Sequence, residues 1–261
     1  MSFTGKIVAI TGAVGGIGQA LCRRFGQEGA SIAAIDRNPS VRDFAAALTT
    51  KDGIAADAAV VDIADAGAVA EAFQRLAKRG VVEVLVNNAG FSNNSTSAKT
   101  DPARWSEAVN VNLNGAYNCA YAVLPGMRAK GGGVIVNIGS VNALAALGDP
   151  AYSAAKAGMM SMTRSLALEY GRYGVRVNIV LPGTVRTPLW NKRAKKDPKV
   201  LATLERWYPL GRIVEPIDVA RAVVFLASDE ASAITGVALP VDCGLTAGNL
   251  VMARELTLED F

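Results

Sequence analysis

The chain of 261 residues contains no histidine. Histidine is the side chain that most often moves protons near neutral pH, so any proton chemistry here must use another group. Cysteine is also scarce: Cys22, Cys119 and Cys243 form no CxxC pair and have no histidine with which to share a zinc ion. We therefore expect reduced thiols in a cytoplasmic protein, a core that needs no disulfide, and no metal site.

Strong net charge and a membrane-spanning segment are lacking too. The formal net charge is +4, and no basic stripe is interleaved with aromatic residues, so we expect no nucleic-acid partner. The N-terminal residues "MSFTGKIVAITG" have neither the apolar core nor the cleavage site of a signal peptide. An uncharged run over 108–127 is long enough to span a bilayer, but it carries four asparagines, whose amides are costly in lipid. We predict a soluble helix there and no membrane association.

Short β-branched runs alternate with alanine-rich stretches along the chain. The runs are apolar on consecutive residues, which is typical of strands covered on both faces. The predicted strands are 6–11, 31–36, 58–63, 82–87, 133–139, 175–180 and 237–242. The predicted helices lie near 17–28, 65–79, 101–129, 150–171 and 215–228. This alternation predicts an α/β fold over 1–261, a single-domain Rossmann-type doubly wound parallel sheet of about seven strands flanked by helices.

The irregular part of the pattern is 183–214, which is long for a connection in such a fold. It follows the carboxyl end of a strand, the edge at which open α/β sheets bind ligands. We predict a helical substrate lid near 188–210; a peripheral helical excursion is the alternative. Four cationic side chains on this segment either steer an anion or form a solvated charge run: Lys192, Arg193, Lys195 and Lys196.

A glycine-rich turn, "TGAVGGIG", follows the first predicted strand. Gly12 permits a sharp turn, and Gly16 and Gly18 let the backbone approach a pyrophosphate at a helix N-terminus. The spacing departs from GxGxxG, and glycine-rich turns also occur for steric reasons alone. Asp36 ends the second predicted strand, near the offset at which a carboxylate accepts hydrogen bonds from the adenosine ribose. A 2′-phosphate would meet like charge there, so NAD is favoured over NADP, although the adjacent Arg37 suits that phosphate.

Six motifs, in this order and spacing, resemble the short-chain dehydrogenase/reductase family over essentially the whole chain. They are "TGAVGGIG" (11–18), "NNAG" (87–90), Asn112 in "NVNLNG", Ser140 in "VNIGS", "YSAAK" (152–156) and "PGTVRTP" (182–188). The resemblance implies an NAD(P)-dependent oxidoreductase whose active site consists of Ser140, Tyr152, Lys156 and Asn112. It also implies that the Asn112 carbonyl holds a water molecule that contacts Lys156.

The resemblance further implies a set of cofactor contacts. Asp62 lies beside the adenine, "NNAG" lines the cleft, and Val185 and Thr187 contact the nicotinamide amide and the phosphates. The full expected set is Gly12, Val14, Gly16, Ile17, Gly18, Asp36, Asp62, Ile63, Asn88, Ala89, Gly90, Tyr152, Lys156, Pro182, Gly183, Val185 and Thr187. One departure is Cys243, which replaces the first glycine of the family's "VDGG" and puts the local turn in doubt.

Tyr152 and Lys156 are four residues apart, so they share a face of the helix that Asp149 and Pro150 are expected to begin. An isolated pair of this kind is typical of a surface tyrosine packed on a lysine stem. Ser140 at the end of the preceding strand favours a catalytic group instead, in which Ser140 binds the substrate oxygen. Tyrosine transfers protons only if its pKa falls towards the working pH, and a nearby ammonium group lowers it.

The expected pocket walls are 91–97, 141–147 and the lid, with Ser140, Asn142, Tyr152 and Trp190 as substrate contacts. They suit a small or medium secondary alcohol or ketone, such as a polyol, a sugar or a hydroxy acid. Two alternatives stay open: an NADPH-dependent 3-oxoacyl thioester reductase, and a dinucleotide sensor without catalysis. The resemblance also implies a homotetramer, paired through the helices near 101–129 and 150–171.

Overall fold

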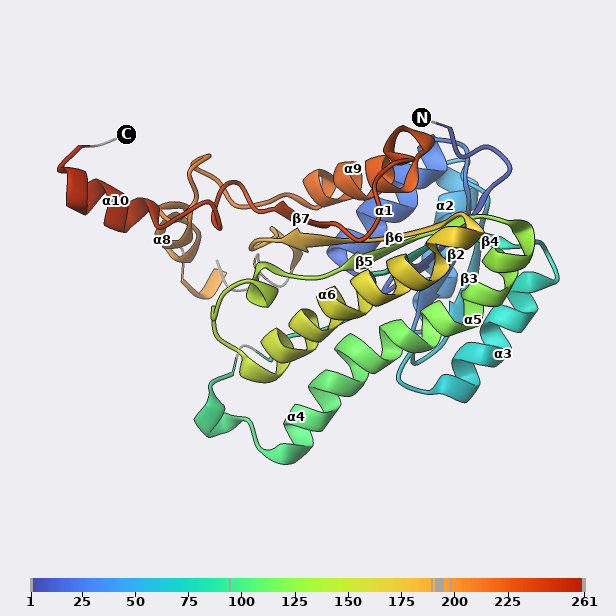
Figure 1. The fold of residues 1–261 in the computed structure, drawn as a ribbon, viewed down its shortest axis with the longest axis horizontal. Coiled ribbons are helices and arrows are strands. Elements are labelled where there is room, and N and C mark those ends of the chain that lie inside the picture. Colours follow the sequence, from blue (N-terminus) through green and yellow to red (C-terminus); the bar gives the residue numbers. More distant parts are fainter. Residues whose placement is uncertain (1, 94, 189, 191–194, 198, 260–261) are drawn as a thin grey trace.

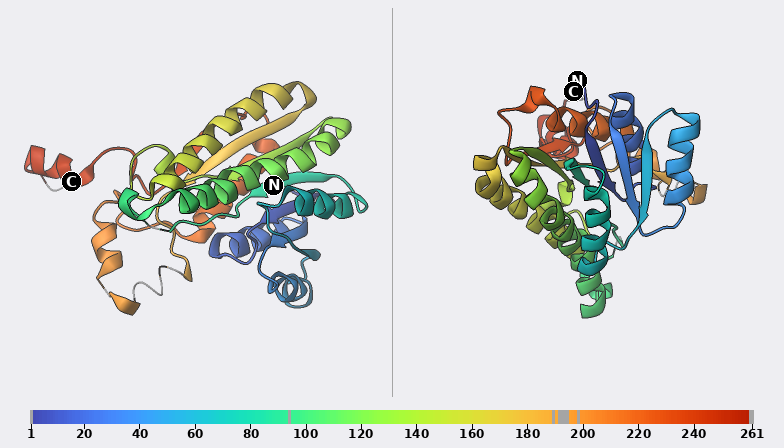
Figure 2. Two further views of the ribbon diagram at one scale, coloured as in Figure 1. Left: turned by 90° about the horizontal axis from the view of Figure 1, so that it is seen from below. Right: turned by 90° about the vertical axis from the view of Figure 1, so that its right-hand side faces the viewer.

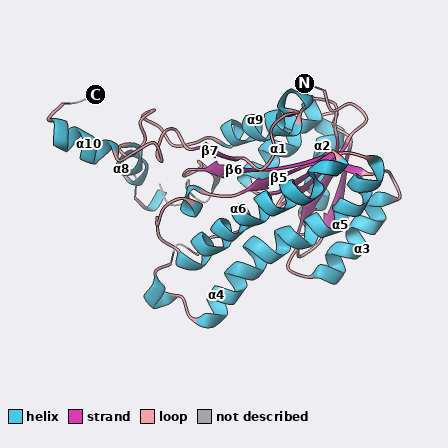
Figure 3. Ribbon diagram, in the orientation of Figure 1, coloured by secondary structure: helices cyan, strands magenta, loops and turns pink. Residues whose placement is uncertain are grey.

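The computed structural model describes residues 2–93, 95–188, 190, 195–197 and 199–259. Seven parallel strands form one sheet in the order β3-β2-β1-β4-β5-β6-β7 (Figures 1 and 3). The strands are β1 (Ile7–Thr11), β2 (Ser31–Asp36), β3 (Ala56–Val60), β4 (Val82–Asn87), β5 (Gly133–Ile138), β6 (Val175–Pro182) and β7 (Ala238–Val241). The predicted fold class is confirmed: a doubly wound parallel sheet of the Rossmann type, with helices on both faces.

The helices form a layer on each face of the sheet (Figures 1 and 2). One layer contains α1 (Gly16–Gln27), α2 (Val41–Lys51) and α9 (Pro216–Ala227). The other contains α3 (Ala66–Ala77), α5 (Gly115–Lys130) and α6 (Pro150–Tyr170), with α4 (Pro102–Val109) preceding α5. Two short helices, α8 (Val200–Glu205) and α10 (Leu250–Thr257), lie beyond the carboxyl ends of β6 and β7, and α10 projects away from the sheet. No helix in the described ranges is long and apolar enough to cross a membrane.

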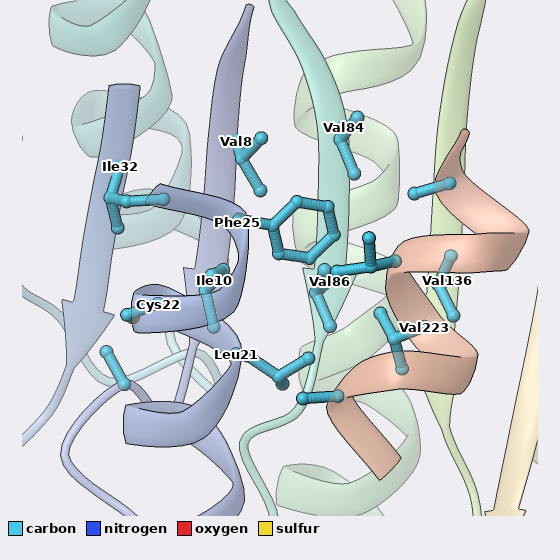
Figure 4. Packing of buried hydrophobic residues seen from close by; sticks show 14 of the residues in the cluster. Val8, Ile10, Leu21, Cys22, Phe25, Ile32, Val84, Val86, Val136 and Val223 are labelled. Atoms are coloured by element: carbon cyan, nitrogen blue, oxygen red, sulfur yellow. The ribbon is translucent and has the colours of Figure 1, made fainter. Parts of the chain in front are cut away.

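The packing of α1 and α9 explains why the strand sequences are apolar on consecutive residues. Phe25 and Leu21 of α1 and Val223 of α9 lie over the central strands (Figure 4). They cover inward-facing residues of four strands: Val8, Ile10, Ile32, Val84, Val86 and Val136. The alternate residues of the same strands, such as Ala9 and Leu85, are buried on the other face. Both faces of the sheet are therefore removed from water.

The third strand was predicted two residues too far along the chain. It spans Ala56–Val60 rather than 58–63, because its pairing with β2 runs from Ile32↔Ala56 to Asp36↔Val60. β3 is an edge strand with exposed residues at its centre, so its apolar pattern is a weak guide to its register. The correction places Asp62 and Ile63 in the loop beyond the carboxyl end of the strand.

Two helix predictions also need correction. The single helix predicted over 101–129 is two α-helices joined by a wide π-helical turn, Asn110–Asn114. Such turns recur at functional sites, and this one contains the fully buried Asn112. The sequence analysis missed α2, whose buried residues Val41, Ala45 and Leu48 have helical spacing.

The order of the strands determines where a ligand binds. The chain winds from β1 outwards to β3, then crosses back so that β4 lies on the other side of β1. In open α/β sheets the crevice at this reversal, beyond the carboxyl ends of the strands, is the binding site. The glycine turn after β1 and "NNAG" after β4 both lie at this crevice.

Candidate active site

Two adjoining cavities open at the carboxyl edge of the sheet. The smaller, about 440 Å³, lies over the ends of β1, β2 and β3, and the larger, about 910 Å³, lies over β5, β6 and the lid. They share the walls formed by Ile17, Asn88, Gly90, Phe91 and Thr187. An elongated ligand can therefore extend from one cavity into the other.

Three glycines of the turn, Gly12, Gly16 and Gly18, lie where a side chain would collide with or crowd neighbouring atoms. Gly12 has φ +66°, and a Cβ atom on it would lie 2.8 Å from Cα of Ala89. A Cβ on Gly18 would collide with the Gly12 carbonyl, and one on Gly16 would lie 3.1 Å from Cγ2 of Thr187. The turn thus exposes backbone at the N-terminus of α1, a position that suits the pyrophosphate of a dinucleotide.

Asp36 is held at the rim of the smaller cavity. One carboxylate oxygen accepts a hydrogen bond from the Val14 amide (3.2 Å) and the other accepts one from the Asn38 amide (2.9 Å). Arg37 is exposed beside it and makes no ion pair with any described residue. Both side chains thus face the position at which an adenosine ribose would lie.

The "NNAG" segment stabilises the glycine turn. Thr11 Oγ1 accepts hydrogen bonds from the amides of Asn88 and Ala89, each 3.0 Å long. The Asn88 side-chain amide donates to the carbonyls of Thr11 (2.9 Å) and Gly12 (3.0 Å). β1 and β4 are thus joined where the cavity begins.

The other predicted cofactor residues divide between the cavities. Val14, Asp62, Ile63 and Ala89 line the smaller one, and Pro182, Gly183 and Val185 line the larger one. Gly18 and the predicted catalytic residue Asn112 line neither cavity and lie behind the walls. Gly18 lets α1 pack on the turn, and Asn112 contacts the backbone of Phe91. The structure thus gathers the predicted set at one edge of the sheet.

Ser140, Tyr152 and Lys156 face the larger cavity together. Ser140, 8% exposed, follows β5, and the other two occupy the first two turns of α6. Lys156 is 3% exposed; its Nζ donates to the Ile138 carbonyl (2.8 Å) and lies 5.6 Å from the centre of the Tyr152 ring. The i, i+4 pair therefore points into the pocket instead of lying on the surface.

The direction of the Tyr152 pKa differs from the expectation. Burial raises the pKa of the Tyr152 hydroxyl, the hydrogen bond with Ser140 lowers it, and the charge of Asp149 raises it; the net direction is upward. Burial also lowers the pKa of Lys156 to about 7. Desolvation destabilises the charged form of both groups, so it outweighs the lowering of the Tyr152 pKa that was expected from Lys156.

Asn112 lies close to Lys156 across Gly90. Its Oδ1 accepts from the Phe91 amide (3.1 Å), and its Nδ2 donates to the carbonyls of Phe91 and Ala108, each at 2.9 Å. A Cβ on Gly90 would lie 2.5 Å from this Oδ1 and 3.4 Å from Lys156 Nζ. Asn112 Oδ1 and Lys156 Nζ are therefore at most about 6 Å apart, a separation that is compatible with one bridging water molecule.

Asp149 is a site residue that the sequence analysis treated only as a helix cap. It precedes α6 as predicted, but its backbone is left-handed (φ 49°) and its side chain does not cap the helix. The carboxylate instead accepts a 2.6 Å hydrogen bond from Ser92, at the wall of the larger cavity. Aspartate adopts positive φ more readily than most residues. The sequence alone therefore could not distinguish this role of Asp149 from that of a helix cap.

The lid contributes an apolar wall to the larger cavity. Trp190 lines it as predicted, together with Leu204, Trp207 and Tyr208. The Tyr208 hydroxyl accepts a hydrogen bond from the Thr184 amide (2.9 Å), which ties the lid to the loop after β6. Of the predicted cationic residues, Lys195 and Lys196 are exposed, whereas Lys192 and Arg193 lie outside the described residues.

The turn at Cys243 forms despite the missing glycine. Cys243 adopts φ +52°, and the carboxylate of Asp242 accepts hydrogen bonds from the amides of Gly244 (3.0 Å) and Thr246 (2.8 Å). These bonds hold the turn, so the substitution leaves the nearby cavity wall in place.

The architecture, the glycine cradle and the Ser–Tyr–Lys cluster define an oxidoreductase of the dinucleotide-binding type. The chain matches a family model described as enoyl-(acyl carrier protein) reductase over residues 12–246. It is 43% identical over 264 residues to an uncharacterized oxidoreductase of Schizosaccharomyces pombe, covering 100% of this chain and 98% of that protein.

Solved structures agree with this family. A short-chain dehydrogenase/reductase from Burkholderia thailandensis is 50% identical, with a TM-score of 0.91 and 99% of both chains covered. A gluconate 5-dehydrogenase from Burkholderia cenocepacia, in complex with NADP and tartrate, is 34% identical, with a TM-score of 0.89 over 95% of this chain and 97% of that chain. The protein belongs to the short-chain dehydrogenase/reductase family and is an oxidoreductase that acts on CH–OH groups.

Proposed function

We propose that the protein is an NAD(H)-dependent oxidoreductase that transfers a hydride between nicotinamide and a secondary alcohol or ketone, such as a polyol, a sugar or a hydroxy acid. The observation that carries this proposal is the convergence of Ser140, Tyr152 and Lys156 in the cavity that adjoins the glycine turn. A protein that only senses a dinucleotide needs no proton-transfer group next to the nucleotide cleft, so this convergence favours catalysis.

The nicotinamide, when bound, supplies the hydride chemistry, and the chain manages one proton. Ser140 donates a hydrogen bond to the substrate oxygen and stabilises its developing charge. Tyr152 accepts the hydroxyl proton during alcohol oxidation and returns one during ketone reduction. Lys156, whose pKa is near 7, exchanges this proton with a water molecule held at the Asn112 carbonyl. The four residues together connect the substrate to solvent.

The pH dependence of alcohol oxidation should respond in opposite directions to two substitutions. The charge of Asp149 raises the pKa of Tyr152, so Asp149→Asn lowers that pKa and moves the rising limb of the kcat/KM profile to lower pH. The Ser140 hydrogen bond lowers the pKa of Tyr152, so Ser140→Ala moves the same limb to higher pH. Steady-state profiles of both variants and the wild type measure these shifts. Shifts in the same direction would contradict the assignment of Tyr152 as the base.

Asp36 supports NAD as the preferred cofactor, because its carboxylate would repel a 2′-phosphate at the rim. Asp36→Asn keeps the shape and removes the charge. We expect the ratio of kcat/KM for NAD to that for NADP to fall at least about tenfold, since charged hydrogen bonds are roughly twice as strong as neutral ones. Asp43→Asn, an exposed charge removal on α2, is the matched control and should leave the ratio unchanged. An unchanged ratio in Asp36→Asn would contradict the assignment.

An NADPH-dependent 3-oxoacyl thioester reductase is the second candidate. Arg37, exposed at the rim of the smaller cavity, favours it because a guanidinium suits a 2′-phosphate. A 3-oxoacyl-[acyl-carrier-protein] reductase of Thermotoga maritima, 36% identical over 251 residues and covering 94% of this chain, also favours it. Turnover of ketones, alcohols and a 3-oxoacyl thioester with each cofactor, followed by nicotinamide absorbance, separates the two candidates. NADPH-specific reduction of the thioester alone would overturn the first.

We further propose a cytoplasmic homotetramer. The free cysteines Cys22, Cys119 and Cys243 support the location, since disulfides are rare in cytoplasmic proteins. Exposed apolar side chains on α4, α5 and α6 support the assembly: Trp105 (42%), Tyr117 (49%), Tyr121 (68%) and Leu168 (85%). Light scattering after size exclusion should give four times the 27.1 kDa chain mass.

A further inference from the structure

Asn142 forms a closed pair with Ser140. It lies in the 3₁₀ turn Val141–Ala143 that directly follows Ser140 at the end of β5. The backbone amide of Asn142 donates to Ser140 Oγ (3.2 Å), and the Ser140 hydroxyl donates in turn to the side-chain oxygen Oδ1 of Asn142 (3.2 Å). Asn142 thus holds the position of Ser140 Oγ and offers an acceptor for its proton beside Tyr152.

The other end of the Asn142 side chain reaches the helix that carries Tyr152. Its Nδ2 donates to the Gly148 carbonyl (3.0 Å) and to Ser153 Oγ (3.1 Å), and Ser153 Oγ donates to the same carbonyl (2.9 Å). Ser153 follows Tyr152 in the first turn of α6. One side chain therefore spans the gap between the two elements that bring Ser140 and Tyr152 together.

This bonding argues against Asn142 as primarily a substrate contact, although it lines the larger cavity. Both donors of its amide are used within the protein, and its oxygen already accepts from Ser140. A substrate that displaced these bonds would detach Ser140 from its support. The geometry leaves Asn142 as part of the framework that surrounds the substrate oxygen.

We propose that Asn142 is a positioning residue that acts through Ser140, an inference that rests on the proposed function. Asn142 Oδ1 holds the Ser140 proton until the substrate oxygen develops negative charge. The proton then turns to that oxygen, because a hydrogen bond to a charged acceptor is stronger than one to an amide carbonyl. Meanwhile the hydrogen bonds from Asn142 Nδ2 to Gly148 and Ser153 keep Ser140 at a fixed position relative to Tyr152.

The test is a double-mutant cycle with Asn142→Ala and Ser140→Ala. We expect Asn142→Ala to lower kcat at least about tenfold while KM stays within about threefold, since positioning acts on the transition state. In the Ser140→Ala background the same change should cost less than about twofold, because the group that it positions is already absent. Ser165→Ala, which removes an exposed hydroxyl of α6 that lines neither cavity, is the control, and its kcat should stay within about twofold.

Three results would overturn the proposal. A raised KM with unchanged kcat in Asn142→Ala would identify Asn142 as a substrate contact. An equal loss of kcat in the wild-type and Ser140→Ala backgrounds would show that Asn142 acts independently of Ser140. A near-normal kcat would show that Asn142 has no role in the reaction. Thermal midpoints and dinucleotide dissociation constants are measured for each variant. If Asn142→Ala does not fold, Asn142→Asp replaces it: the near-isosteric carboxylate holds the Ser140 proton more firmly and should also lose kcat non-additively. Wild-type turnover is measured first, so that a failure of the proposed function itself is seen separately.

Discussion

Replacing Tyr152 with phenylalanine is expected to lower kcat by at least about 100-fold, the loss typical of a removed general acid–base group. Tyr152 lines the larger cavity beside Ser140, with Lys156 Nζ 5.6 Å from its ring centre. The substitution removes the hydroxyl and keeps the ring, so the packing of α6 is preserved. Dinucleotide affinity, measured by fluorescence titration, should fall far less than kcat, because the substitution removes one expected contact and leaves the glycine turn and Asp36 untouched.

Tyr117→Phe is the matched control for this experiment. Tyr117 is 49% exposed on α5, away from both cavities, and its substitution removes the same atom without touching the site. Its kcat should equal that of the wild type. If Tyr152→Phe kept near-normal kcat across the pH range, another group would carry the proton and the proposed mechanism would be wrong.

Replacing Gly90 with alanine is expected to lower kcat by at least about tenfold, less than the roughly 100-fold loss for a removed acid–base group because Tyr152 itself is kept. The added methyl group would lie 2.5 Å from Asn112 Oδ1, closer than Cβ atoms come to other atoms, and 3.4 Å from Lys156 Nζ. Asn112 is fully buried and bound to Phe91 and Ala108, so it cannot move aside cheaply. The methyl group therefore fills the gap assigned to the bridging water.

Gly126→Ala provides the control for the alanine substitution. Gly126 lies within α5, where a Cβ would meet Val81 at an ordinary 3.6 Å, and its kcat and thermal midpoint should match or exceed those of the wild type. Single-turnover rates are the informative measurement, because they separate proton transfer from product release. A Gly90→Ala enzyme with an unchanged single-turnover rate would exclude a water at this gap.

The parts of the molecule that follow from repeated local patterns were predictable from the sequence. Consecutive apolar residues indicated strands covered on both faces, and the burial of neighbouring Val8 and Ala9 on opposite sides of β1 explains why. The crevice was predictable as well, because the carboxyl ends of parallel strands meet at one edge. For this reason the sequence placed Gly12, Asp36 and Asn88 at the nucleotide cleft, and all three line the smaller cavity.

The features that the sequence analysis missed depend on contacts between distant segments. Asn112 in the π-helical turn donates to the backbone of Phe91, 21 residues earlier, a contact that local spacing does not show. Asp149 binds Ser92 across 57 residues, so its spacing before Tyr152 suggested a helix cap. The direction of the Tyr152 pKa depends on burial, which the YxxxK spacing does not report.

Hydride transfer between a carbinol carbon and nicotinamide is the central step of the proposed reaction, and isotope transfer tests it directly. The substrate is a secondary alcohol whose oxidation by the protein is first detected by nicotinamide absorbance. It is deuterated at its carbinol carbon and oxidised with NAD, and the recovered nicotinamide is examined by NMR. We predict one deuterium at C4 of the ring, on a single face, and none released to water. Unlabelled nicotinamide with deuterium in the solvent would contradict the account.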